Sequence, residues 1–284
     1  MRDGRAPVLQ KRTAHHAAGA YSPRVNPRVS AVCLDVDGTI TDGVGGPALR
    51  GATAALRLLR AAFPVRLITN TTSRPHASLA RHLIGLGLLD EPEHLLTPAM
   101  VAKRVLPARS HESGILLVEP EARVDYGWFR DDPGGAAVVL ATEAHGFRIA
   151  DLQPAFRRLL DGASLYTLQR NRFFRKDGEL VTDLGPLAAF FTYATGRDAE
   201  TLGKPSRLLY EAVADELEIP LAEILMVGDD AEFDVSASVA LGMRGALVRT
   251  GKYRKGDEDR VSPAPTAVLE SCAALPGWLG IAAQ

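Results

Sequence analysis

Short runs of apolar residues alternate along the chain with longer segments of helical spacing, and three of the runs end in polar residues. The runs and their polar ends are 29–34 followed by DVDGT, 65–68 followed by TN, and 224–227 followed by GDD. Strands that alternate with helices form parallel sheets, in which ligands bind at the carboxyl ends of the strands. The pattern therefore predicts an α/β fold with a polar site at one edge of a sheet.

The alternating segments fall into two sets, and the second set interrupts the first. The first set has expected strands at 29–34, 65–68, 224–227 and 243–248, and expected helices at 48–62, 78–86, 205–217 and 235–241. The second set has expected strands at 115–118, 136–140 and 164–168, and expected helices at 152–160 and 187–193. We therefore predict a doubly wound, Rossmann-like parallel-sheet core from residues 29–97 and 199–284, with an inserted α/β domain at 98–198.

Composition and charge narrow the class of protein. Apolar residues make up 46% and charged residues 24%, as in soluble globular proteins, and the net charge of -1 gives no attraction toward nucleic acid or an anionic membrane. Two distant cysteines, Cys33 and Cys272, do not form a disulfide framework. Residues 1–28 are basic and lack the apolar run of a signal peptide. We expect a cytoplasmic protein with a flexible extension at 1–28 and with neither nucleic acid nor membrane as partner.

The DVDGT motif places two carboxylates, Asp35 and Asp37, at the mouth of the first strand. One carboxylate held ionised by a cation can act as a nucleophile, while a neighbour whose pKa is raised by burial can carry a proton. A calcium loop is an alternative, but Ile40 and Gly46 stand where such a loop needs Gly and Glu. A plain turn after a strand is a second alternative, so this motif alone decides little.

Two further segments could hold a phosphate. Thr69 and Asn70 end their strand with a hydroxyl and backbone N–H groups that suit an anion, although a structural turn is the simpler interpretation. Lys204 precedes an expected helix and could neutralise phosphate oxygens, although an isolated lysine is more often a solvated surface group. The segment is not a P-loop, because Pro205 stands where Ser or Thr is required.

The GDD segment supplies carboxylates at the third strand end. Asp229 and Asp230 follow the apolar run directly, and Asp234 comes shortly after them. Magnesium prefers one or two carboxylates together with waters and substrate phosphate. We therefore predict Mg²⁺ as the cofactor at this strand end.

Taken together, LDVDGT, ITN, GKP and VGDDAEFD resemble the four motifs of the haloacid dehalogenase-like (HAD) phosphatase superfamily, in the same order. The long insertion between ITN and GKP is similar to the large C2-type cap of subfamily IIA, the NagD-like branch. The resemblance covers residues 29–282 and implies a HAD fold with a C2-type cap domain. It also implies a phosphatase, because haloacid dehalogenases lack the second aspartate that Asp37 supplies here.

The resemblance implies a role for each matching residue. Asp35 would attack phosphorus and form an aspartyl-phosphate, and Asp37 would protonate the leaving oxygen and then deprotonate the attacking water. The other implied roles are metal binding by Asp35, the backbone carbonyl of Asp37 and Asp229, phosphate binding by Thr69, Asn70 and Lys204, and support of the metal site from behind by Asp230 and Asp234.

The inserted domain is expected to select the substrate. The resemblance places the specificity loop at residues 169–176, QRNRFFRK, with Asn171 and Arg172 as candidate specificity residues. Basic residues beside aromatics also suit single-stranded nucleic acid, but the chain has no overall basic excess. Caps of this type favour small phosphorylated molecules, although relatives that act on phosphorylated protein side chains have been described. Relatives often dimerise through the cap. We therefore expect a small phosphorylated substrate and a homodimer through the cap.

Two other functions are compatible with the same fold. A non-catalytic phosphoryl-binding module would not need both Asp35 and Asp37, so the intact pair argues against it. A phosphotransferase would differ only in using a hydroxyl other than water as acceptor, and the cap type favours hydrolysis.

Overall fold

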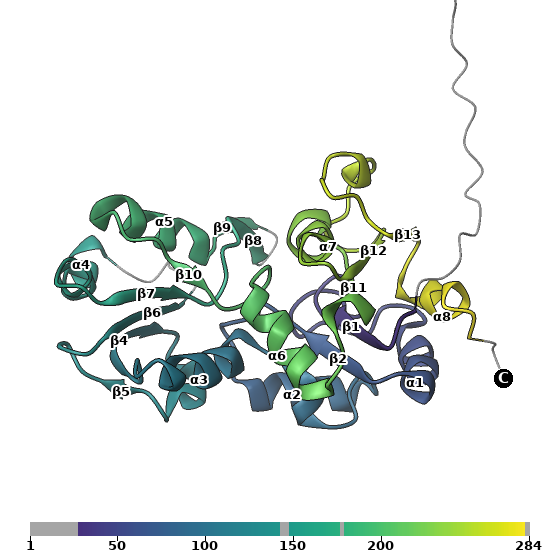
Figure 1. Ribbon diagram of the computed structural model, residues 1–284, viewed down its shortest axis with the longest axis horizontal. Helices are drawn as coiled ribbons and strands as arrows, with labels where there is room; N and C mark the ends of the chain where they lie inside the picture. The colour runs from purple at the N-terminus through teal and green to yellow at the C-terminus, as the bar shows by residue number, and fades with distance from the viewer. Residues whose placement is uncertain (1–27, 143–147, 177–178, 282–284) are drawn as a thin grey trace, which may run out of the picture.

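The computed structural model describes residues 28–142, 148–176 and 179–281, and its two parallel β-sheets occupy separate halves of Figure 1. The extension predicted at 1–28 lies outside the described residues, apart from Arg28. The α/β fold class is confirmed. Within the part of the chain that is described, no helix combines the length and the apolar character that crossing a membrane requires.

The first sheet has six parallel strands in the order β13-β12-β11-β1-β2-β3. Its strands are β1 (Ala31–Asp35), β2 (Val65–Ile68), β3 (Leu95–Leu96), β11 (Ile224–Gly228), β12 (Arg244–Val248) and β13 (Ala267–Leu269). The chain builds outward from β1 on one side and from β11 on the other, so the strand order reverses between them. Such a reversal leaves a crevice at the carboxyl ends of the strands, where ligands bind.

The second sheet is also parallel and has the order β10-β7-β6-β4-β5. Its strands are β4 (Ser113–Val118), β5 (Arg130–Asp131), β6 (Ala137–Ala141), β7 (Ser164–Thr167) and β10 (Glu200–Thr201). An antiparallel hairpin follows β7 and consists of β8 (Phe173–Lys176) and β9 (Glu179–Thr182). The second sheet extends to Thr201, slightly past the predicted domain boundary at 198/199.

Helices pack on both faces of the first sheet, as a doubly wound core requires. The α-helices of the described residues are α1 (Ala52–Ala62), α2 (His76–Gly85), α3 (Pro98–Ala108), α4 (Gln153–Leu160), α5 (Leu184–Thr195), α6 (Arg207–Leu217), α7 (Ala237–Ala240) and α8 (Leu275–Trp278). Of these, α4 and α5 pack on the second sheet, against β6. Along β1, Val32 and Leu34 join an apolar cluster with α1, while Cys33 joins a second cluster with α6. The second cluster continues into the other sheet, so one apolar core connects the two halves.

Two predicted helices begin later than expected. The helix predicted from residue 48 begins at Ala52, because Ala48 pairs with Thr41 in a β-bridge and the Leu49 N–H donates to the Ile40 carbonyl at 2.9 Å. The helix predicted from residue 205 begins at Arg207. The Ser206 side chain accepts a hydrogen bond from the Leu208 N–H at 3.2 Å, which caps the helix after Pro205.

The helix predicted at 235–241 is a composite of two helix types. A π-helical turn spans Ala231–Ser236 and leads directly into α7. The Asp230 carbonyl accepts from the N–H groups of Asp234 and Val235, at 3.1 and 3.2 Å, which widens the turn. Single π-helical turns are rare and often lie at functional sites, and this one carries Asp234 into the crevice.

Candidate active site

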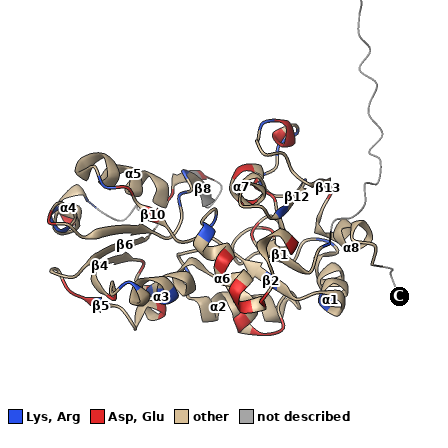
Figure 2. Ribbon diagram, in the orientation of Figure 1, with Lys and Arg blue, Asp and Glu red and all other residues tan. Residues whose placement is uncertain are grey.

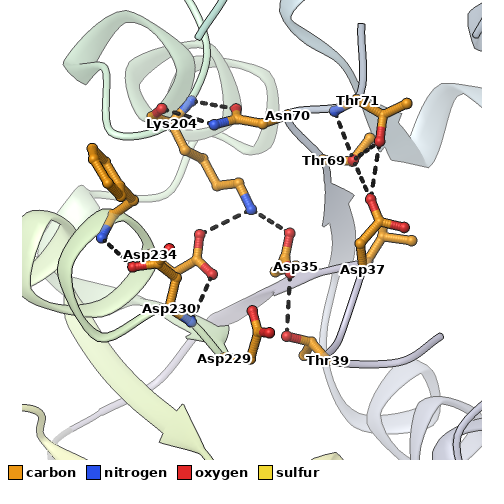
Figure 3. Close-up of polar contacts among 12 residues, drawn as sticks. Asp35, Asp37, Thr39, Thr69, Asn70, Thr71, Lys204, Asp229, Asp230 and Asp234 are labelled. Atoms are coloured by element: carbon orange, nitrogen blue, oxygen red, sulfur yellow. Dashed lines mark hydrogen bonds and ion pairs between the residues drawn. The ribbon is translucent and has the colours of Figure 1, made fainter. Parts of the chain in front are cut away.

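The crevice between β1 and β11 collects the polar ends of several strands (Figure 3). Asp35 ends β1, Asp229 directly follows β11, and Thr69 directly follows β2. Lys204 enters from the loop between β10 and α6. The parallel register of the strands therefore brings together residues that lie far apart in the sequence.

Lys204 is a buried cation between two carboxylates. Its side chain is 4% exposed, and Nζ forms ion pairs with Asp35 Oδ1 and, at 2.9 Å, with Asp234 Oδ1. Asn70 holds the lysine backbone, because Asn70 Oδ1 accepts from the Lys204 N–H at 2.8 Å and Asn70 Nδ2 donates to the Lys204 carbonyl at 2.9 Å. The Asn70 amide, predicted to bind phosphate, thus positions the lysine that faces the site.

Three buried carboxylates form a compact cluster, namely Asp35, Asp229 and Asp234. One oxygen from each can be chosen so that all lie within 4.8 Å of one another. Asp229 Oδ2 accepts a hydrogen bond from the Lys252 N–H at 2.6 Å, whereas Asp229 Oδ1 is buried and has no hydrogen-bond partner among the described residues. A buried carboxylate oxygen without a partner, next to two further carboxylates, fits a divalent cation such as Mg²⁺.

Burial changes the protonation of this cluster. It raises the pKa of Asp35, that of Asp229 to about 8 and that of Asp234 to about 7, with repulsion from neighbouring carboxylates adding to each. Burial by itself lowers the pKa of Lys204, but the charges of Asp234 and Asp35 raise it well above its ordinary value. Lys204 therefore stays charged, and the carboxylates around it still favour additional positive charge.

The side chain of Asp37 turns away from the carboxylate cluster (Figure 3). Asp37 Oδ2 accepts a hydrogen bond from Thr71 Oγ1 at 2.9 Å and lies 3.1 Å from Thr69 Oγ1. The burial that the sequence suggested for Asp37 is found at Asp35 instead, and Asp37 is half-buried. The Thr69 N–H, which the sequence suggested for anion binding, donates to the Leu96 carbonyl at 3.1 Å.

Asp230 acts on the backbone of the π-helical turn. Its Oδ1 accepts hydrogen bonds from the N–H groups of Glu232 and Phe233, at 3.1 and 3.0 Å. Its Oδ2 lies 3.4 Å from Lys252 Nζ. Asp230 therefore fixes the start of the turn that carries Asp234, while Asp234 itself reaches the cluster.

The loop after β12 closes the site and was missed as a functional segment. Thr250 Oγ1 donates to the Gly38 carbonyl at 2.6 Å, and the Lys252 backbone binds Asp229. A Cβ atom on Gly251 would stand 1.9 Å from Asp229 Oδ2, so only glycine allows this approach. The sequence signal was available, because TGK follows an apolar strand as the other motifs do. Thr71 was also missed, although it stands two residues after Thr69.

A cavity of about 420 Å³ lies beside the site, where the second sheet meets the loop that follows Lys204. Its described lining residues are Arg170, Arg172, Thr201, Pro205, Ser206 and Phe233. Of the two candidate specificity residues, Arg172 lines this cavity and Asn171 is not among those described lining residues. The Asn171 backbone N–H instead donates to Gln169 Oε1.

Two family models match the two halves of the first sheet. A haloacid dehalogenase-like hydrolase model matches residues 32–126, and a HAD-hydrolase-like model matches residues 201–275. The chain is also 35% identical over 245 residues to haloacid dehalogenase-like hydrolase domain-containing protein 2 of Bos taurus, covering 86% of this chain and 93% of the relative. The chain belongs to the haloacid dehalogenase-like hydrolase family.

Other members of this family carry phosphatase names. The phospholysine phosphohistidine inorganic pyrophosphate phosphatase of Bos taurus is 33% identical over 235 residues, covering 81% of this chain and 86% of the relative. The solved 4-nitrophenylphosphatase of Thermotoga maritima has a TM-score of 0.79 at 21% identity, covering 89% of this chain and 98% of that one. NagD of E. coli K-12 has a TM-score of 0.77 at 21% identity, covering 87% of this chain and 98% of NagD. These relatives assign the chain to the phosphatases of the family, and the two structures confirm its fold.

Proposed function

We propose that this HAD-family phosphatase is Mg²⁺-dependent and hydrolyses a small phosphate ester through an aspartyl-phosphate formed on Asp35. The observation that carries the proposal is the contact between the buried Lys204 ammonium and Asp35 at the switch point of the sheet. The Lys204 charge opposes the rise in the Asp35 pKa that burial causes, and so favours the ionised carboxylate that attacks phosphorus. The same ammonium lies where it neutralises charge on the transferring phosphoryl group.

Asp37 is proposed to act as general acid and then as general base. Its carboxylate is oriented by the hydroxyls of Thr69 and Thr71 and lies outside the Lys204 ion pairs. It is therefore free to give a proton to the leaving oxygen and to take one from the water that hydrolyses the intermediate. Thr69 is proposed to contact the phosphoryl group as well, since its hydroxyl lies beside the Asp37 carboxylate at the carboxyl end of β2.

Asp35, the backbone carbonyl of Asp37 and Asp229 are proposed to hold the Mg²⁺, with Asp234 and Asp230 behind them. When bound, the ion supplies positive charge that stabilises the transferring phosphoryl oxygens. The unpartnered Asp229 Oδ1 supports this assignment. The carboxylates themselves must lose their protons for the ion to bind, which links metal affinity to pH.

Three further proposals concern the domains, the oligomeric state and the location. The core is assigned to residues 29–97 and 199–284 and the cap to residues 98–198. A homodimer through the cap is supported by exposed apolar residues on two helices in contact, Leu160 on α4 and Tyr193 on α5. A cytoplasmic location agrees with the two buried free thiols, Cys33 and Cys272.

Phosphate release from a panel of phosphoesters tests the proposal. The wild-type protein and Asp35→Asn are assayed with Mg²⁺ and with EDTA. We expect hydrolysis by the wild type with Mg²⁺ alone and no turnover by Asp35→Asn in either condition. Activity that survives in EDTA, or an active Asp35→Asn protein, contradicts the mechanism.

A further inference from the structure

Two arginines line the cavity beside Lys204, and the described residues offer neither of them an acidic partner. Among the described residues, neither Arg170 nor Arg172 forms an ion pair, and the cavity's lining contains no acidic side chain. In Figure 2 the basic segment that leads into β8 lies beside the start of α6. The charged side chains of the cavity are therefore basic, whereas in the catalytic cluster three carboxylates outnumber the Lys204 ammonium.

The backbone that carries these arginines is held in place. The Gln169 side chain is 2% exposed, is hydrogen bonded to Asp183 and accepts from the Asn171 N–H. The Arg172 carbonyl accepts from the Asp183 N–H at 3.1 Å, and the Asn171 carbonyl accepts from the Gly185 N–H at 2.9 Å. Both arginines are exposed, but their backbone positions are fixed before any ligand arrives, which lowers the entropic cost of binding.

Three residues that line the cavity are close neighbours in sequence of residues in the site. Pro205 and Ser206 follow Lys204, and Phe233 precedes Asp234. Lys204 also contacts both Asp35 and Asp234, so the leaving group of a phosphoester bound at Asp35 can extend from there toward Phe233 and the two arginines. A volume of about 420 Å³ lies within the range of small-molecule pockets.

We infer that this cavity binds the leaving group of the substrate, and that the leaving group carries a second anion, a carboxylate or a phosphate. Guanidinium groups bind both anions through paired, charge-assisted hydrogen bonds. Phe233 adds an apolar surface for the carbon skeleton of the leaving group. This inference rests on the proposed function, because it needs Asp35 as the site of phosphoryl transfer.

Matched aryl phosphates test the inference with Mg²⁺ present. The probes are 4-carboxyphenyl phosphate, its neutral isostere 4-carbamoylphenyl phosphate, and hydroquinone bisphosphate. We expect the wild type to have a kcat/KM at least about fivefold higher for an anionic probe than for the neutral one, since an exposed arginine pair contributes about that much. Comparing the two anionic probes identifies which anion is preferred.

Variants identify the residues responsible. In Arg170→Gln and Arg172→Gln, the ratio of kcat/KM between anionic and neutral probes is expected to fall, and in the double variant it approaches one. Arg172→Lys should retain part of the ratio, because it keeps the charge. Arg157→Gln, which removes an exposed arginine from α4 away from the cavity, should leave the ratio at its wild-type value.

Two kinds of failure are distinguishable. If the wild type hydrolyses all three probes equally well, or if the arginine variants lose activity on all of them in equal proportion, the inference is wrong and the proposed phosphatase mechanism stands. If the wild type hydrolyses none of them with Mg²⁺, both the mechanism and the inference that depends on it are overturned.

Discussion

At the residue scale, Lys204 is the cation that partly neutralises the buried carboxylates of the site. It is buried, it contacts Asp35 and Asp234, and it is held from behind by Asn70. Removing one partner of a buried ion pair leaves uncompensated charge in a medium that solvates it poorly. The lysine therefore matters for stability as well as for catalysis.

Replacing Lys204 with methionine tests both roles. We expect Lys204→Met to lose about 10²- to 10³-fold in kcat, as when a preorganised transition-state contact is removed. In EDTA its free energy of unfolding should fall by about 3 kcal/mol, the lower end for a broken buried pair. The control is Lys103→Met on α3, where the lysine is exposed. Kinetics and urea unfolding measure the two effects, and a Lys204→Met protein with near wild-type kcat would contradict the assignment.

Gly38 is required by a close approach as well as by its backbone conformation. Gly38 has φ +91° and a Cβ there would stand 2.2 Å from Asp229 Oδ2, whereas Gly256 has φ +89° with no atom within 4 Å of a Cβ. Both Gly→Ala changes incur the backbone cost of about 1 kcal/mol. Only Gly38→Ala should also displace Asp229 and lower activity and Mg²⁺ affinity. Equal activity of the two variants would show that the close approach is unimportant.

At this scale the sequence indicated most of the residues that meet in the crevice. Asp35, Lys204 and Asp229 were recognisable because each follows a strand or precedes a helix. Their contacts were not, since the ion pair of Lys204 with Asp234 depends on a π-helical turn that no residue spacing revealed. The sequence also did not reveal that the Asn70 side chain holds the Lys204 backbone, because the two residues lie far apart in the chain. Phosphate binding by Asn70 stays a prediction.

Among the elements, β1 and β11 are the two central strands of the first sheet. All five residues of β1 are buried and it pairs with both β2 and β11. The longer strands of both sheets were predictable, because apolar runs bounded by turn residues mark them. The two-residue strands β3, β5 and β10 were not, since pairing with a neighbour rather than their own sequence defines them.

Thiol reactivity measures how firmly β1 is held. Burial raises the pKa of the Cys33 thiol to about 12 and that of Cys272 to about 11. The reactive thiolate is therefore far scarcer in the folded protein at pH 8 than in the unfolded chain. A thiol-specific chromogenic reagent should label neither cysteine rapidly in native buffer and both in denaturant. Rapid labelling of Cys33 in the native protein would contradict the buried central strand.

At the scale of the whole molecule, one apolar cluster spans both sheets, and the site lies at the carboxyl ends of the central strands of the first sheet. The alternation of strands and helices predicted the doubly wound arrangement and the insertion. It could not place the second sheet against the loop of Lys204, because packing between the two halves is decided by side chains distant in sequence. The cavity lined by Arg170 and Arg172 became apparent only from that packing.

The free energy of unfolding of the metal-free protein should fall as pH rises. Burial raises the pKa values of Asp234 and Asp229 from the ordinary 3.8 to about 7 and about 8, so the folded state binds more protons than the unfolded chain between these limits. Its stability therefore falls as pH rises through about 8, while the effect of Lys204 is lost only at far higher pH. Mg²⁺ should oppose this fall by binding the deprotonated carboxylates.

Thermal unfolding from pH 6 to pH 9, with EDTA or with Mg²⁺, measures this dependence. The stabilisation by Mg²⁺ should grow with pH and be absent in Asp229→Asn. Asp90→Asn, which changes a carboxylate at the surface, is the control and should retain it. A metal-free protein that becomes more stable toward pH 9 would contradict the proposed carboxylate cluster.

The covalent intermediate on Asp35 is tested most directly with Asp37→Asn and 4-nitrophenyl phosphate. This leaving group departs without a proton, so the variant should still transfer the phosphoryl group to Asp35 but fail to activate water for the second step. The account predicts a burst of about one nitrophenolate per active site, with a phosphoryl group on the peptide that contains Asp35. Slow linear turnover with no burst and no phosphorylated peptide, or a phosphoryl group on another residue, would contradict it.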